Sequence, residues 1–102
     1  MPKTYTPPQA FETTPRPLIT LARVKSHQIA AAGYSPELET LALQFNPRAG
    51  ETTAVVYHYP GVTPEKFAEF MAAESLGKYH GANFKPMIFR KYPAEPLPEL
   101  LA

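Results

Sequence analysis

The chain has 102 residues, of which 44% are hydrophobic, and a formal net charge of +1 at pH 7. These values fit one domain of modest size and exclude a wholly disordered chain. Cysteine is absent, which excludes disulfides, thiolate catalysis and cysteine-ligated zinc. Because the charges nearly balance, any attraction to a polyanion must come from local charge segregation.

The prolines divide the chain into three parts. Five of the 13 prolines precede Leu18 and three follow Tyr92. Proline fixes φ and lacks a backbone donor, so both ends are expected to be extended and unpaired. We therefore predict Pro-rich tails at 1–17 and 93–102 around a compact domain at 18–92. No apolar signal or membrane span is recognisable, so a cytoplasmic protein without membrane contacts is expected.

Three strands are expected in the first half of the domain. Residues 19–32 predict an early strand, closed by a Gly-Tyr-Ser-Pro turn at 33–36. Apolar and polar residues alternate over 40–45, which indicates a half-buried strand. Asn-Pro-Arg-Ala-Gly at 46–50 is turn chemistry, and β-branched and aromatic residues at 53–59 predict the next strand.

A helix is expected after the strands. Thr63 is a suitable N-cap, and Pro64 suits the first helical position. The following residues place an apolar stripe at helical spacing, formed by Phe67, Phe70 and Met71. Gly77 is expected to provide a left-handed exit, so the predicted helix spans 63–76.

These elements predict an α+β fold. Short connections favour a three-stranded antiparallel β-meander with one α-helix packed on one face. Pro86 interrupts regular structure after the helix. We therefore expect a short irregular segment and then an edge strand at 87–92.

Three short motifs follow one another in the predicted domain. They are VKSHQIAAAGYS at 24–35, YHY at 57–59 and SLGKYHG at 75–81. In order and spacing they resemble the KTSC domain, a module named for the C-terminal domain of some lysyl-tRNA synthetases. His27, Ser35 and His80-Gly81 depart from the family pattern. The matching residues to which we assign a structural role are Gly33, Tyr34, Tyr57, Tyr59, Ser75 and Gly77.

The resemblance implies a small stand-alone domain of bacteria and their phages, without established catalytic activity. The synthetase context implies a role in RNA binding. The residues themselves also argue against an enzyme, because the chain has no aspartate and its three histidines lack metal-ligand spacing. We expect neither a catalytic residue nor a cofactor or metal.

Tyr57 and Tyr59 share one face of the strand at 53–59, and two roles are open to them. They could form a platform on which bases stack, as sheet aromatics do in single-strand binding proteins. They could instead pack beneath the helix against Phe67 and Phe70. We expect packing, with His58 on the solvent side.

Charge segregation is the stronger binding signal. No acidic residue lies between Ser75 and Ala94, and a second acid-free run with Arg16, Arg23 and Lys25 separates Glu12 from Glu37. Cations contact phosphates and aromatic rings stack on bases, so this mixture favours RNA or single-stranded DNA. The first run supplies the candidate nucleic-acid-binding residues, namely Lys78, Tyr79, Phe84, Lys85, Arg90 and Lys91.

A protein-interaction module is the alternative function. Extended Pro-rich segments lose little entropy on docking, so the tails at 1–17 and 93–102 would suit a partner protein. A phage or prophage accessory factor that docks on a host protein is one example. The sequence does not define an oligomeric state.

Overall fold

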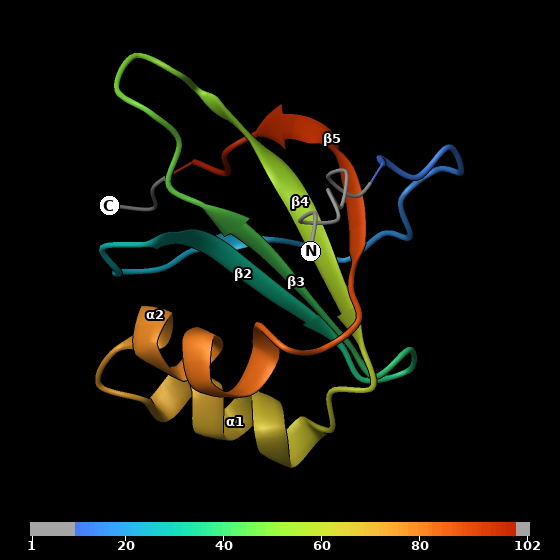
Figure 1. Ribbon diagram of the computed structural model, residues 1–102, viewed down its shortest axis with the longest axis vertical. Helices are drawn as coiled ribbons and strands as arrows, with labels where there is room; N and C mark the ends of the chain where they lie inside the picture. Colours follow the sequence, from blue (N-terminus) through green and yellow to red (C-terminus); the bar gives the residue numbers. More distant parts are fainter. Residues whose placement is uncertain (1–9, 100–102) are drawn as a thin grey trace, which may run out of the picture.

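The computed structural model describes residues 10–99 as an antiparallel sheet with a helical layer on one face (Figure 1). The strands are β1 (Ala22–Arg23), β2 (Ile29–Ser35), β3 (Thr40–Phe45), β4 (Thr53–Pro60) and β5 (Arg90–Pro96). The helical layer consists of α1 (Pro64–Ala72), α2 (Leu76–Tyr79) and a single π-helical turn, η1 (His80–Phe84). No helix in the described range is long and apolar enough to cross a membrane.

The sheet has five strands in the order β1-β2-β3-β4-β5, and every neighbouring pair is antiparallel. The prediction of a three-stranded meander with one helix is therefore wrong, although a meander of β2, β3 and β4 forms its centre. β1 has two residues, too few to produce a recognisable alternation. It is visible only through its pairing with β2.

The edge strand predicted at 87–92 is present as β5, but it spans 90–96. Residues 93–96, assigned above to a tail, continue this strand beyond Tyr92. Glu95 pairs with Ala54 and Tyr92 with Val56, so two residues of β5 stand opposite one residue of β4. Such a bulge on an edge strand accommodates a residue without an N–H, and Pro93 lies there.

The helix predicted at 63–76 ends early, because α1 stops at Ala72 and a separate helix, α2, begins only at Leu76. Its start is as expected, because Pro64 opens α1 and the Thr63 hydroxyl accepts the Lys66 N–H at 3.2 Å. The backbone becomes extended at Ala73 (φ −68°, ψ 143°), and Ser75 then caps α2 by accepting the Lys78 N–H at 3.2 Å. A second cap within the apolar pattern thus starts a new helix.

The first strand also differs from its prediction. The chain leaves the sheet between β1 and β2, and β2 continues through Ser35. The turn therefore occupies 36–39, where Glu39 has a φ of 46°, rather than 33–36. Gly33 has no turn conformation; it lies in the middle of β2 beneath the backbone of Thr20.

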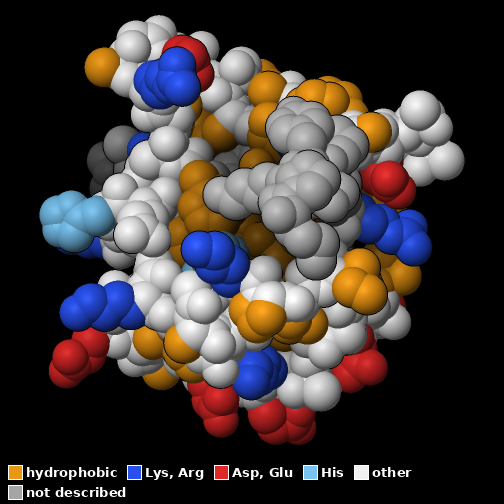
Figure 2. Space-filling view, in the orientation of Figure 1, with side chains coloured by type: hydrophobic (Ala, Val, Ile, Leu, Met, Phe, Trp, Pro, Cys, Tyr) orange, Lys and Arg blue, Asp and Glu red, His pale blue; other side chains and the backbone are white. Residues whose placement is uncertain are grey.

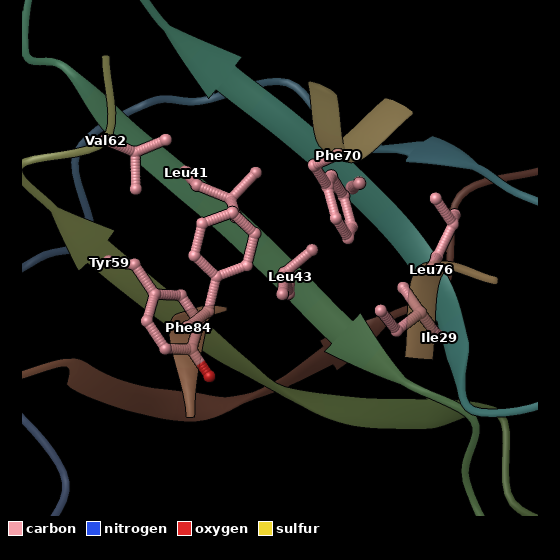
Figure 3. Close-up of a cluster of buried hydrophobic side chains, with 9 residues drawn as sticks. Ile29, Leu41, Leu43, Tyr59, Val62, Phe70, Leu76 and Phe84 are labelled. Atoms are coloured by element: carbon pink, nitrogen blue, oxygen red, sulfur yellow. The ribbon is translucent and has the colours of Figure 1, made fainter. Parts of the chain in front are cut away.

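The larger core lies between the sheet and the helical layer (Figure 3). Side chains from β2, β3 and β4 meet side chains from α1, α2 and η1 there, and each large apolar residue contributes about 1.5–3 kcal/mol when buried. The labelled members of this cluster are Ile29, Leu41, Leu43, Tyr59, Val62, Phe70, Leu76 and Phe84.

The opposite face of the sheet, here called the back face, is covered by the chain that precedes β1. Ile19 packs there with Ala42, Val56 and Tyr92. The Arg16 guanidinium forms two bonds to the Glu95 carboxylate, of 2.6 and 2.9 Å. Parts of both predicted tails thus pack against the domain.

Candidate nucleic-acid interface

A groove of about 700 Å³ separates the β1–β2 connection from the start of α2. We call it the basic groove. One wall comes from residues 23–28, the other from residues 74–78, and Asn46 also lines the groove. Its charged or titratable lining residues are Arg23, Lys25, His27, Glu74 and Lys78.

The basic groove joins the two acid-free runs of the sequence. Arg23 and Lys25 belong to the first run and Lys78 to the second. Among the described residues that line it, Glu74 is the acidic one, so the net charge of the lining is positive. In Figure 2 a histidine and basic side chains gather at the left edge, where Figure 1 places the β1–β2 connection and α2.

Hydrogen bonds hold the first wall in place. The Ser26 hydroxyl accepts the N–H groups of Gln28 and Ile29, both at 3.2 Å. The Asn46 side chain donates to the carbonyls of Ser26 and His27, both at 3.1 Å. Sequence reasoning missed Asn46, because it was assigned to the hairpin turn. The wall is thus a fixed loop that presents Lys25 and His27 outward.

Gly77 determines how closely the second wall approaches the first. It is buried within α2, and a Cβ atom there would lie 2.6 Å from the side-chain oxygen of Gln28. The expected left-handed exit at Gly77 is therefore wrong; its role is close packing. Ser75 and Gly77, from the third motif, thus line the same groove as Ser26 and Gln28, from the first motif.

The two central tyrosines pack on the side of the sheet that the helical layer covers. The Tyr59 side chain is 3% exposed, and its hydroxyl lies 2.9 Å from His80 Nε2. Tyr57 is half-buried and makes edge contacts with Phe45 and Phe89, each with ring centroids 5.4 Å apart. Burial raises the pKa of Tyr59 well above its ordinary value. The ring contacts of the two tyrosines are with Phe45, Phe84 and Phe89, rather than with Phe67 and Phe70 as predicted. Tyr59 is too buried to serve as a stacking platform.

Tyr34 is likewise structural. Its ring stacks on Phe67 with centroids 4.6 Å apart and planes 9° from parallel. Its hydroxyl donates to the Val62 carbonyl at 2.6 Å. These contacts tie the end of β2 to the start of the helical layer.

The rings of the two candidate stacking residues, Tyr79 and Phe84, make packing contacts within the fold. Phe84 has no exposed surface, so bases cannot reach it, and the prediction that it stacks on bases is wrong. Tyr79 is half-buried against Phe84 and Phe70, and its hydroxyl donates to the Glu69 carboxylate at 2.8 Å. The sequence did not reveal that these two rings pack inward. Their packing depends on η1, and a single π-helical turn leaves no periodic pattern in the sequence.

Comparison with known proteins identifies the fold. The family model of the KTSC domain matches residues 25–89. The chain belongs to the KTSC domain family. The resemblance noted in the sequence is thereby confirmed, and the matched span includes both walls of the basic groove except Arg23 and Val24.

Relatives of this KTSC domain occur in several bacteria. A protein of Tsukamurella paurometabola is 41% identical over 63 residues, covering 62% of this chain and 85% of that protein. An uncharacterized protein of Stutzerimonas stutzeri is 31% identical over 67 residues, covering 66% and 86%. The crystal structure of a KTSC domain protein from Yersinia pestis is 27% identical, with a TM-score of 0.64, and covers 74% of this chain and all of that chain.

The four cations of the C-terminal run are not brought together in this KTSC domain. Lys78 is exposed at the basic groove. Lys85 follows η1, and burial first, and then the charge of Lys85, lower the pKa of His80. Arg90 and Lys91 are successive residues of β5, so they point to opposite faces. Figure 2 shows basic side chains as separate patches, with acidic ones along the lower edge.

Arg90 and Lys91 therefore have different surroundings. Arg90 lies on the back face beside His58 and Tyr92. The Lys91 ammonium lies 4.6 Å from the centre of the Phe11 ring, within cation–π distance. Among the four sequence-predicted cations, Lys78 is the one that lines the basic groove.

His58 is buried rather than exposed to solvent. Its exposed fraction is 2%, because the segment before β1 covers the back face. The Arg16 guanidinium donates to His58 Nε2 at 3.1 Å, which requires that nitrogen to be unprotonated. Burial first, and then Arg16, lower the pKa of His58 to about 4. The prediction of a solvent-facing His58 is wrong.

Proposed function

We propose that this KTSC domain is a non-catalytic binding protein that holds RNA or single-stranded DNA by its phosphates in the basic groove. The observation that supports this is the convergence of Arg23, Lys25 and Lys78, which come from acid-free runs about 50 residues apart. The proposal keeps the nucleic-acid partner expected from the sequence. It relocates the contact from the C-terminal run to the groove.

Phosphate contacts rather than stacking account for binding in this proposal. Tyr59 and Phe84 are buried, so base stacking there is ruled out. A concave basic groove on a protein can hold the flexible backbone of a single strand. Recognition of a duplex usually requires a protein element that protrudes into a groove of the nucleic acid. Three phosphate contacts on a single strand give a salt slope of about −2 on logarithmic axes, with modest affinity.

Catalysis is not part of the proposal, since the hydroxyls of the groove serve the fold. The Ser26 hydroxyl accepts two backbone N–H groups, and the Ser75 hydroxyl accepts the Lys78 N–H. Within the described range no group of three or more histidine or acidic side chains could hold a metal ion. Backbone-bonded hydroxyls without an adjacent base lack the activated nucleophile that acyl or phosphoryl transfer needs.

The proposal is tested by fluorescence anisotropy. Labelled RNA and single-stranded DNA of about 12 nucleotides, and the matching duplex, are titrated at about 50 and 200 mM salt. The test variant is Lys25→Gln/Lys78→Gln. The matched control is Lys66→Gln/Lys85→Gln, which removes the same charge at sites that do not line the groove.

We expect the test variant to bind at least tenfold more weakly than wild type, with a flatter salt dependence. The control should retain most of its affinity. Equal losses in both variants would show that net charge, not the basic groove, governs binding. Absence of salt-dependent binding to any oligonucleotide would overturn the proposed function.

A protein-interaction module stays the alternative prediction. Its predicted docking segments are partly integrated into the fold, because the Glu12 N–H donates to the Lys91 carbonyl at 2.8 Å and 93–96 belong to β5. A deletion that tests docking must therefore spare them. Residues 1–9 and 100–102, outside the described residues, are the segments to remove.

A further inference from the structure

A second hollow, on the back face, is separate from the basic groove. It has a volume of about 210 Å³ and lies where β3 begins and β4 ends. We call it the back-face hollow. Its apolar lining residues are Pro17, Leu38, Pro60 and Tyr92, and two of its polar lining residues are His58 and Arg90.

His58 supplies a hydrogen-bond donor at this hollow. Its Nε2 accepts from Arg16, so the neutral ring carries its proton on Nδ1. Within residues 10–99 no group accepts a hydrogen bond from that nitrogen. Because His58 lines the hollow, an acceptor oxygen of a bound ligand can take the place of solvent at this N–H.

The electrostatic field at the back-face hollow is positive. Arg16 is paired with Glu95, so its charge is largely balanced. Arg90 is exposed beside His58, and among described residues no carboxylate lies within 4.0 Å of its guanidinium. The charge of Arg90 therefore acts on whatever enters, and it favours an anion.

We propose that the back-face hollow binds a carboxylate attached to a small apolar group. One carboxylate oxygen accepts the Nδ1 proton of His58, the guanidinium of Arg90 pairs with the carboxylate, and the apolar group contacts Pro17 and Leu38. This site is independent of the proposed nucleic-acid interface, because no residue lines both hollows. A carboxylate that meets a guanidinium gains charge-assisted hydrogen bonds.

The size of the hollow limits the ligand. Sites for drug-sized molecules occupy about 300–1,000 Å³, so a hollow of about 210 Å³ fits one ring or a short branched chain. Two sources present this chemistry. They are free organic acids and the C-terminal carboxylate of a peptide that ends in an apolar residue.

The first experiment is a ¹H–¹⁵N NMR titration with sodium benzoate. Benzyl alcohol, which has the same ring and no charge, is the ligand control. We expect saturable shifts of amide signals around Thr40, His58 and Tyr92 with benzoate, and shifts at least fivefold smaller with benzyl alcohol at equal concentration. Absence of saturable benzoate shifts at these amides, or equal shifts with both compounds, would overturn the proposal.

The second experiment changes the exposed cation. Arg90→Gln removes the charge without altering a buried side chain, and Arg48→Gln is the matched control on the β3–β4 loop. We expect Arg90→Gln to weaken benzoate binding about tenfold and Arg48→Gln to leave it within about twofold of wild type. Equal effects of both substitutions would contradict the site.

Short peptides then distinguish the two sources. A tripeptide that ends in leucine with a free carboxylate is compared with its C-terminal amide. Tighter binding of the acid peptide than of benzoate assigns the site to peptide C-termini. Binding of benzoate with exclusion of both peptides assigns it to free organic acids. Binding of the amide as tightly as the acid would contradict carboxylate recognition.

Discussion

Tyr59 acts on the core in two ways, through its ring and through its hydroxyl. The ring centroid lies 6.0 Å from that of Phe84 and 5.8 Å from that of Phe89, and the hydroxyl forms a hydrogen bond of 2.9 Å with His80 Nε2. We predict that Tyr59→Phe lowers the free energy of unfolding by about 1–2 kcal/mol, because it leaves a half-buried nitrogen without its partner. Urea denaturation measures this loss.

Tyr57→Phe is the matched control for that substitution. The Tyr57 hydroxyl has no hydrogen-bond partner among the described residues, and its ring contacts survive the change. We expect a loss below about 0.5 kcal/mol. A loss at Tyr57 equal to that at Tyr59 would mean that the His80 hydrogen bond adds nothing measurable.

His58 makes stability depend on pH. Its pKa is lowered to about 4 in the fold, whereas an unfolded histidine titrates near 6.5. Below pH 6.5, His58 therefore binds a proton in the unfolded chain but stays neutral in the folded chain, so the free energy of unfolding falls as pH falls. Burial lowers the pKa of His80 as well, which acts in the same direction.

We expect His58 to reduce the free energy of unfolding by about 2 kcal/mol between pH 7 and pH 5. Urea titrations at pH 7, 6 and 5 measure the change. His27→Gln, at an exposed histidine, should follow the wild-type profile, and His58→Gln should flatten it. Unchanged wild-type stability at pH 5 would contradict a buried neutral His58.

Residue-scale reasoning from sequence succeeded where a side chain's face follows from strand alternation. That rule put Tyr57 and Tyr59 on one face of their strand, and both side chains belong to or pack against the core beneath the helical layer. The rule also placed His58 on the other face, correctly, but that face is covered by a segment containing Arg16 and Ile19. No local pattern predicts such a cover, because it depends on contacts between residues far apart in sequence, such as Arg16 and His58.

At the scale of elements, Gly33 shows how closely the cover approaches the sheet. A Cβ atom at this position would meet the Thr20 carbonyl oxygen well inside contact distance. We predict that Gly33→Ala lowers the free energy of unfolding by about 1–3 kcal/mol, because the chain before β1 must move away from β2. Thermal denaturation followed by circular dichroism measures this effect.

Gly81→Ala provides the comparison for that prediction. Gly81 lies in η1, and a Cβ atom there would meet nothing within 4 Å. Alanine is the better helix former, so this variant should equal or exceed wild type in stability. Destabilisation of Gly81→Ala to the same extent as Gly33→Ala would remove the steric explanation for Gly33.

Element prediction was accurate where local chemistry is distinctive. The alternation at 40–45 and the cap at Thr63 located β3 and the start of α1. β1 is too short for a pattern. The continuation of β5 through 93–96 was missed because Pro93 lacks an N–H, but Pro93 lies at a bulge, where that donor is not needed. The break after Ala72 was missed, since Ser75 caps α2 inside a stretch that reads as one helix.

At the scale of the whole molecule, both faces of the sheet are covered but the coverings differ in origin. The helical layer lies within the span that matches the KTSC family, 25–89. The pair formed by Arg16 and Glu95, which ties the N-terminal cover to β5, lies outside that span. The basic groove belongs to the helical side, and the back-face hollow belongs to the other.

Sequence predicted the charges of the candidate interface but not their arrangement. Two acid-free runs were evident, yet only folding brings Lys78 to Arg23 and Lys25 and sends Arg90 to the back face. The β1–β2 connection and the break before α2 bring these three cations together, and neither feature was predicted from the sequence. The charge runs therefore led to the proposal of a polyanion partner, but they did not locate the groove.

The most direct test of the basic groove is an NMR titration of the ¹⁵N-labelled protein with a short single-stranded RNA. The account predicts that the largest amide shifts fall on residues 23–28 and 74–78, and that they shrink as salt is raised. Amides of β5, including Arg90, should change little. Shifts centred on 85–91, or no salt-dependent shifts at the groove, would contradict the account.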